Sequence, residues 1–373
     1  MHLSRRSLFA VLAGGTCARF VHAQGKQGGA IFAQNRGVSA DLPTQLGGKD
    51  IKQWIAEISS LDPSRRENAI RTVPLLRGAE EAIPALINCV KRDNDSSPRV
   101  NAVMALGAID FHRQEDITKA VEALTYRVTN DNQAIVRFQA ALVLGRFGGQ
   151  ARPAMEALIK ATSDQGSWEI RKAAVFALSR AAFDADRPVA SPAINALVQH
   201  MSATNESSSL VRLEATMCIS SIGGVNPADN KTVVAALRRA EDDKEKMIGI
   251  WARVGLCVHD NKLEAKDVDT LIKFMRSPHL PERTHAARAL GTIAYVGNMG
   301  PLIKPAIPAL IELTRDKEEL ARVAAIWALG RVGAPAKPAL PRLNEMLKDK
   351  ELGAEGKGFI KEAIQMIESK ARD

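Results

Sequence analysis

The sequence predicts an all-α protein in which about eight helix-turn-helix units stack into an α-solenoid with a capping helix at each end. Aromatic residues make up only 4% of the chain, so the large side chains that fill a thick core are scarce. Ala, Leu, Ile and Val are abundant, and Val and Ile do not alternate with polar residues over any long stretch, which favours helices over strands. The third observation is an internal repeat of about 37 residues, a length typical of stacked helical units.

The first helix of each repeat follows a pattern that opens with a basic or apolar residue and places small or apolar residues at the fourth and eighth positions. Since these positions recur every three to four residues, they share one face of a helix. A Gly after the eighth position in several copies allows close packing or helix termination. The copies begin at Arg66, Arg99 (RVNAVMALG), Arg137 (RFQAALVLG), Arg171 (RKAAVFALS), Arg212, Met247, Arg283 and Arg322 (RVAAIWALG).

A second helix is predicted in each repeat because a Pro, which suits the first helical turn, precedes another apolar run. These prolines include Pro84, Pro153, Pro192, Pro305 and Pro338. An Asp then marks the junction to the next repeat, at Asp95, Asp131, Asp164, Asp243, Asp316 and Asp349. A short acidic side chain can cap the next helix. We expect the Arg that opens a repeat to pair with a junction Asp, which makes the Arg column a structural ladder rather than an anion-binding stripe.

The combined pattern, VRxxAAxALGxxG followed by xPALxxLxxD over residues 64–350, resembles the HEAT repeat and in particular the short variant of phycobilisome-lyase-like proteins. The resemblance implies a solenoid whose second helices line a concave, partner-binding face. Residues 50–61 and 358–370 are predicted to be amphipathic helices that cover the open ends of the stack.

The N-terminal residues 1–23 are predicted to be a signal peptide, because they are basic, contain a short apolar run and lack acids. The stretch around Arg5 and Arg6 resembles a twin-arginine export signal with cleavage after Ala23. A general secretory signal and an organellar presequence remain alternatives. Residues 24–49, rich in Gly and Gln, are expected to be a flexible linker before a solenoid over residues 50–373. The expected location is periplasmic or extracellular.

The candidate contact residues lie on the exposed face of the predicted second helices and at one helix start. When the second helices are aligned on a shared Leu, the residue two positions later is Tyr126, Lys160, Gln199, Arg239 or Lys273. The position three residues further along holds Arg276 and Arg315, and Trp168 lies where a loop meets a helix. Because residues at i and i+3 share a helix face, these side chains form a polar surface. We expect it to bind a protein or peptide partner, whereas the alternative for any single position is a solvated helix face.

The sequence offers little for catalysis, metals or cofactors. His279, Glu282 and His285 form the sole local group of metal-ligand types, but Pro278 and Pro281 predict a turn there, and no CxxC or CxxCH motif occurs. Cys89, Cys218 and Cys257 are expected to be small buried residues, with a bridge between the last two as an alternative. We therefore expect no enzyme and no cofactor.

Other functions are disfavoured by charge and by the predicted export. The net charge of +9 includes three arginines of the signal peptide, and no polybasic block or membrane-spanning run follows. A bilin-lyase-like or chaperone-like factor and a nucleic-acid-binding protein similar to HEAT-like DNA glycosylases are the alternatives. Both activities would be expected in the cytosol. The identity of the partner and the oligomeric state stay open.

Overall fold

The computed structural model describes residues 42–182, 191–222, 225–260, 263–296, 300–349 and 354–369. The predicted signal peptide and most of the predicted linker lie outside the described residues. The chain divides into two compact units, of which the first ends at Leu197 and the second begins at Val198. None of the helices in the described ranges is long and apolar enough to cross a membrane.

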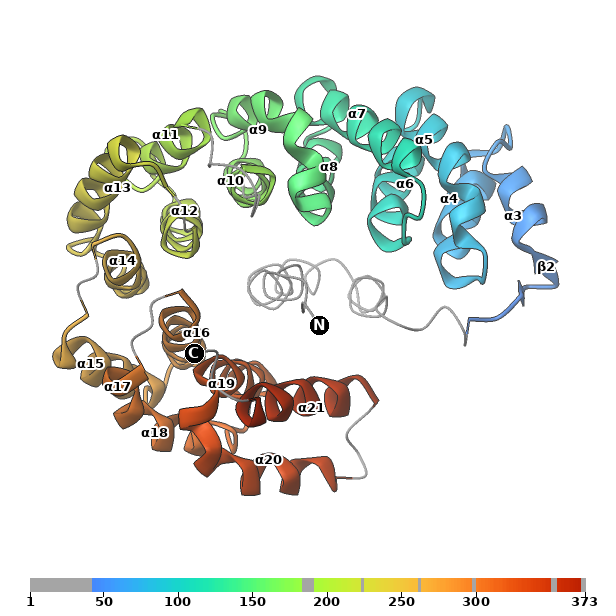
Figure 1. Ribbon diagram of the computed structural model, residues 1–373. Helices are drawn as coiled ribbons and strands as arrows, with labels where there is room; N and C mark the ends of the chain where they lie inside the picture. The colour runs from blue at the N-terminus through green and yellow to red at the C-terminus, as the bar shows by residue number, and fades with distance from the viewer. Residues whose placement is uncertain are drawn as a thin grey trace. The chain divides into compact units, whose positions relative to one another are not determined.

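The first unit is a two-layered stack of helices (Figure 1). Its elements are β1 (Gln45–Leu46), β2 (Lys49–Asp50), α3 (Ile51–Glu57), α4 (Pro63–Thr72), η1 (Val73–Leu75), η2 (Ala79–Ala82), α5 (Ile83–Arg92), α6 (Ser96–Ala108), α7 (Gln114–Asn130), α8 (Ala134–Phe147), η3 (Gly148–Ala154), α9 (Met155–Ala161), α10 (Trp168–Ala182) and the start of α11 (Ser191–Gln199). The first helices α4, α6, α8 and α10 pack successively against one another. The second helices α5, α7 and α9 form the other layer.

The second unit repeats this arrangement. It comprises the end of α11, α12 (Ser209–Ser221), α13 (Pro227–Ala240), α14 (Lys246–His259), α15 (Ala265–Met275), α16 (Leu280–Val296), α17 (Gly300–Ile303), η4 (Lys304–Ala306), α18 (Ile307–Leu313), α19 (Glu319–Val332), η5 (Ala334–Ala339), α20 (Leu340–Leu347) and α21 (Ala354–Glu368). The first helices α12, α14, α16 and α19 pack in succession, and α13, α15 and α18 each pack on the first helix that follows. All eight predicted repeat starts lie in helices, so the predicted all-α solenoid is confirmed.

The core lies between the two layers and between successive first helices. At the fourth and eighth positions of the repeats, residues such as Ala140, Leu144, Ala325 and Leu329 have no exposed surface. Gly291 shows why a residue without Cβ follows the eighth position, because an added Cβ there would lie 2.2 Å from the ring of Trp327 on the next first helix. The repeat pattern thus encodes how closely neighbouring helices approach.

The predicted capping helices are α3 and α21. A short antiparallel hairpin, in which Leu46 pairs with Lys49, precedes α3. Trp54 of α3 is 6% exposed, and its indole N–H donates to the carbonyl of Leu46 at 3.0 Å. The end of the segment expected as a linker therefore folds back onto the first helix of the stack.

The prolines that were expected to open the second helices take two structural roles. Pro84 occupies the first turn of α5, as expected. Pro153, Pro305 and Pro338 lie instead in the 3₁₀ turns η3, η4 and η5, which precede α9, α18 and α20. In these three repeats, the second helix therefore begins with a 3₁₀ turn, which is wound more tightly than an α-helix.

The predicted Arg ladder is present and has a recurring geometry. Arg99 donates from Nε and Nη2 to Asp131 at 2.9 and 3.1 Å, and from Nη1 to the carbonyls of Asp93 and Asn94, both at 2.9 Å. The Arg99 guanidinium thus links residues 93–94, which precede its own helix α6, to Asp131, which precedes α8 of the next repeat. Corresponding ion pairs join Arg66 to Asp93, Arg137 to Asp164, Arg212 to Asp243 and Arg283 to Asp316.

Asp131 is not the N-cap residue of the helix that follows it, but it holds that N-cap residue in place by a hydrogen bond. Oδ1 of Asp131 accepts the backbone N–H of Gln133, which is itself the N-cap residue of α8, while Oδ2 accepts from Arg99. In the first junction this role belongs to Asp93 rather than Asp95, because Asp93 accepts the N–H of Asp95. Asp95 adds a second ion pair to Arg66 at 2.7 Å.

Candidate protein-binding surface

In the first unit, the predicted contact residues separate into two layers. Tyr126 on α7 is 56% exposed, and the guanidinium of Arg127 lies 5.3 Å from the centre of its ring. Lys160 is exposed on α9, which packs beside α7. Trp168 is half-buried at the start of α10, in the layer of first helices. Tyr126 and Lys160 therefore share the second-helix layer, and Trp168 does not.

In the second unit, the remaining predicted residues are all exposed, but only some of them come together. Gln199 ends α11, and Arg239 lies on α13. Lys273 and Arg276 lie at the end of α15, which packs against both η4 and α18. Nε of Arg276 is 3.6 Å from Oε2 of Glu312 on α18, and Arg315 follows α18 directly. The structure thus brings Arg276 to Glu312 of the next repeat, whereas Arg315, three residues after Glu312, makes no ion pair with it.

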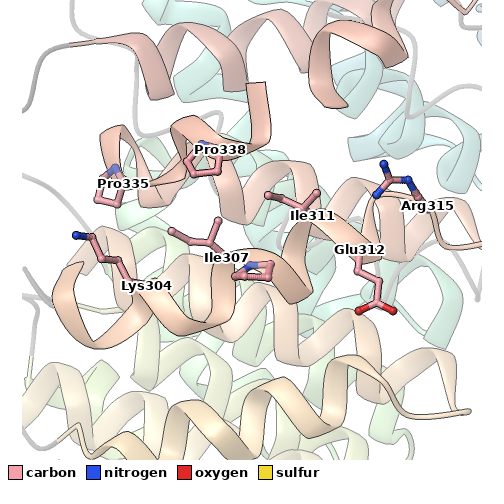
Figure 2. A pocket seen from close by; sticks show the side chains of 8 residues that line it. Lys304, Ile307, Ile311, Glu312, Arg315, Pro335 and Pro338 are labelled. Carbon is pink, nitrogen blue, oxygen red and sulfur yellow. The ribbon is translucent and has the colours of Figure 1, made fainter. Parts of the chain in front are cut away.

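Next to these residues lies an open groove of about 470 Å³. Its apolar lining comes from Ile307, Pro308 and Ile311 of α18 and from Pro335 and Pro338 of η5. Lys304, Glu312 and Arg315 complete the lining, and Figure 2 shows Lys304 and Arg315 at opposite ends of the row of apolar side chains. The groove forms because the proline-containing 3₁₀ turn of one repeat lies beside the second helix of the repeat before it.

The charge around the groove is positive. Lys304 on η4, Lys273 and Arg276 at the end of α15, and Arg315 after α18 are exposed cations, and Glu312 and Glu345 are acids near them. The Arg276 and Glu312 side chains are 63% and 69% exposed, so solvent weakens their attraction. Lys304 and Arg315 make no ion pair within the described part of the chain. The groove therefore presents an apolar strip between two available cations.

Comparison with known families now places the chain. A family model for HEAT repeats matches residues 51–145, 83–179 and 268–353, which together are more than half of the sequence. The chain belongs to the HEAT-repeat family. The matched residues 268–353 include most of α15 and all of α18 and η5, so the groove lies within the part of the chain that the family model matches.

Solved structures that match the chain include an engineered protein, with a TM-score of 0.45, 20% identity, and coverage of 86% of this chain and 89% of that one. Kap121p bound to Ste12p gives a TM-score of 0.41 and 13% identity over 85% of this chain and 41% of Kap121p. YibA of Escherichia coli gives 0.39 and 17% identity over 84% of this chain and 100% of YibA. A search of curated proteins gave no match.

The sequence pattern predicted Arg276 and Arg315 as contact residues, but it did not predict Lys304 or the apolar lining of the groove. Lys304, Pro335 and Pro338 lie in 3₁₀ turns, where helical periodicity assigns no face. One sequence feature could have indicated the groove. Two prolines lie three residues apart at each of two successive repeat turns, Pro305 with Pro308 and Pro335 with Pro338.

The candidate metal ligands do not converge. Nδ1 of His285 accepts a hydrogen bond from the indole of Trp251 at 3.0 Å, and Glu282 accepts one from the Ser277 hydroxyl. Across the described ranges, no three His, Cys, Asp or Glu side chains are placed to share a metal ion.

The three cysteines of the described residues are buried thiols, as the sequence predicted. Cys89, Cys218 and Cys257 all lie inside the helical layers. Burial raises the pKa of both Cys89 and Cys257 to about 12, with nearby carboxylates adding to the effect. These two thiols are therefore protonated and unreactive near neutral pH.

Proposed function

We propose that this HEAT-repeat protein is a non-catalytic scaffold that binds a protein or peptide partner through the exposed surface of its second helices. The observation that carries the proposal is the apolar groove between α18 and η5, with available cations at both ends. Apolar surface bordered by polar groups favours macromolecular contact, because binding removes the apolar part from water while the rim selects the partner.

The absence of catalysis is part of the proposal and is supported by the state of the reactive groups. The thiols of Cys89 and Cys257 are buried with raised pKa values, and His285 is 7% exposed and bonded to Trp251. A nucleophile or general base must reach its substrate, and these three groups are almost fully buried.

The function is tested by affinity capture from an extracytoplasmic fraction, followed by mass spectrometry. We expect the chain to retain a protein partner, and we expect the double variant Arg239→Glu with Lys273→Glu to retain less of it at low salt. The melting temperature should stay nearly unchanged because both residues are exposed. The difference from the parent should shrink as salt rises, since salt screens the same charges.

A matched control for this experiment is the double reversal Arg65→Glu with Arg71→Glu. Both residues are exposed on α4, a first helix far along the sequence from the proposed surface. Capture by this control should equal that of the parent. If the parent chain retains no protein, the proposed function is wrong. If the Arg239 and Lys273 variant retains every partner as well as the parent does, these two residues are not part of the contact surface.

Export is the second part of the proposal, and it rests on the sequence alone. Arg5 and Arg6 within the basic, acid-free N-terminus support a twin-arginine route to the periplasm or the exterior. Changing both to Lys should block that route, because it depends on the guanidinium pair, and should spare a general secretory route. Fractionation of cells that express each form measures this, and a parent chain confined to the cytoplasm would refute export.

A further inference from the structure

The groove between α18 and η5 has the form of a site for one particular kind of peptide. Ile307 lies at the base of the groove and is 5% exposed. Ile311 and Pro335 are half-buried, and Pro308 and Pro338 are exposed. The lining thus forms a continuous apolar strip that is open to solvent. An occupant gains most from this strip if it presents more than one apolar side chain to it.

The two cations set the length of the occupant. Lys304 and Arg315 are eleven positions apart along η4 and α18, and a helical rise of about 1.5 Å per residue places their backbones about 17 Å apart. An extended peptide advances about 3.3 Å per residue and directs every second side chain to the same face. Acidic residues at positions i and i+6 of such a peptide lie about 20 Å apart, within reach of the long Lys and Arg side chains.

The charges around the groove favour acidic groups at these two ends. Glu312 already has Arg276 within 3.6 Å, and Glu345 accepts from Arg342 at 2.9 Å, so the neighbouring acids have other partners. Lys304 and Arg315 make no direct ion pair within the described residues, although Arg315 adds to the effect by which Arg342 lowers the pKa of Glu345. Since no acid contacts either cation directly, both can pair with a ligand. An Arg can also bind a carboxylate with two parallel hydrogen bonds.

We propose that this groove binds an extended peptide segment with the pattern acidic-x-apolar-x-apolar-x-acidic. The two apolar side chains pack on the strip formed by Ile307, Ile311, Pro335 and Pro338, and the acidic side chains pair with Lys304 and Arg315. This inference rests on the proposed function and specifies its partner chemistry. A nucleic acid fits less well, because the groove is apolar between the two cations and offers no further positive charge to the phosphates there.

The test uses the full chain and a fluorescein-labelled peptide, Gly-Glu-Ser-Ile-Ser-Leu-Ser-Glu-Gly, in a fluorescence anisotropy titration at low salt. We expect saturable binding, and we expect it to be lost for a peptide with Ser in place of Ile and Leu. A peptide with Lys in place of both Glu should bind at least about tenfold more weakly than the parent peptide. A single-stranded oligonucleotide that binds more tightly than the acidic peptide would overturn the assignment in favour of nucleic acid.

The protein variants make the test specific to this groove. Lys304→Glu with Arg315→Glu should weaken the acidic peptide about tenfold or more and should strengthen the Lys-containing peptide. Lys337→Glu is the matched control, because Lys337 is exposed on η5 but does not line the groove. Both variants should melt like the parent, and Ile311→Glu provides a further variant that removes the apolar strip without touching either cation.

The outcomes separate this inference from the proposed function. If the parent binds no acidic peptide, or if the charge-reversed variant binds it as well as the parent does, the groove assignment is wrong. If the parent also captures a protein from the extracytoplasmic fraction, and Lys304→Glu with Arg315→Glu captures it equally, the scaffold function stands and the groove is not its contact site. If the parent captures no protein at all, the function itself fails.

Discussion

Two Arg–carboxylate pairs join neighbouring repeats of the second unit and differ sharply in their surroundings. Arg283 and Asp316 lie 2.6 Å apart with side chains that are each 10% exposed, whereas Arg276 and Glu312 lie 3.6 Å apart and are 63% and 69% exposed. Arg283 also donates to the carbonyls of Ser277 and Pro278, so its guanidinium is held by several groups at once. The buried Arg–Asp pairs between successive repeats, which we call the seam, therefore contribute to the stability of the stack. An exposed pair such as Arg276 with Glu312 contributes little to stability and can exchange its partners.

Lowering the pH acts together on the seam pairs that contain Asp93, Asp131, Asp243 and Asp316, and it should give the largest effect. Burial alone would raise the pKa values of Asp93, Asp131, Asp243 and Asp316, but hydrogen bonds from Arg and from backbone N–H groups outweigh it, and the net pKa of each lies below its usual value. A carboxylate with a lowered pKa stabilises the fold above its unfolded pKa of about 3.9, and this stability is lost as the pH falls through the folded pKa.

We therefore expect the free energy of unfolding to fall steeply below about pH 4, as measured by urea unfolding followed by circular dichroism at several pH values. Asp131→Asn should make the acid dependence shallower, because it removes one titrating seam group. A free energy of unfolding that is constant between neutral pH and about pH 3 would contradict the role assigned to the ladder.

Arg283→Ala should have the largest effect of the single substitutions, a loss of about 3 to 5 kcal/mol in the free energy of unfolding. The change leaves Asp316 and the carbonyls of Ser277 and Pro278 without their Arg partner in a buried seam. Arg65→Ala is the matched control, because Arg65 is 71% exposed and lies 3.9 Å from Asp62. The control should change the free energy by less than about 1 kcal/mol. Equal losses for the two variants would remove the distinction between seam and surface.

Leu144→Ala and Leu329→Ala test the apolar part of the seam. Both leucines have no exposed surface, so truncation opens a cavity between layers and should cost about 2 to 5 kcal/mol. Leu61 is 99% exposed, and Leu61→Ala should change stability by less than about 0.5 kcal/mol. Chemical denaturation measures all three. A cost below about 1 kcal/mol at both buried sites would mean that neighbouring repeats repack freely.

The contrast between seam and surface also explains what the sequence could reveal. The first-helix pattern recurs because each Ala and Leu meets the same packing environment in every repeat, so the eight helix starts and the Arg–Asp pairing were predictable. The sequence did not predict that Asp93, rather than Asp95, takes the junction role in the first repeat. Both acids fit the pattern, and only the hydrogen bond from the Asp95 backbone N–H to Asp93 distinguishes them.

The groove was less predictable because three separate elements build it. Ile307 and Ile311 follow helical periodicity, but Lys304 comes from η4 and Pro335 and Pro338 come from η5 of the next repeat. Their side chains meet only after the two repeats stack. Among the predicted contact residues, Arg315 lines the groove and Arg276 pairs with its Glu312, whereas Tyr126 and Lys160 belong to the other unit.

Arg276→Ala should have the smallest effect on stability and completes the comparison with Arg283. Its ion pair with Glu312 is long and mostly exposed, and both side chains give up rotational freedom to form it, so the free energy of unfolding should change by less than about 1 kcal/mol. The same substitution frees Glu312, which then places an unpaired negative charge in the groove lining. Binding of the acidic peptide should therefore weaken even though stability is retained, and Arg276→Ala with Glu312→Ala should recover part of that binding because it removes the repelling acid. Urea unfolding and the anisotropy titration on the same preparations measure the two quantities. A loss of several kcal/mol for Arg276→Ala would show that surface pairs also hold the repeats together, and the division between a structural seam and an adjustable binding surface would then be wrong.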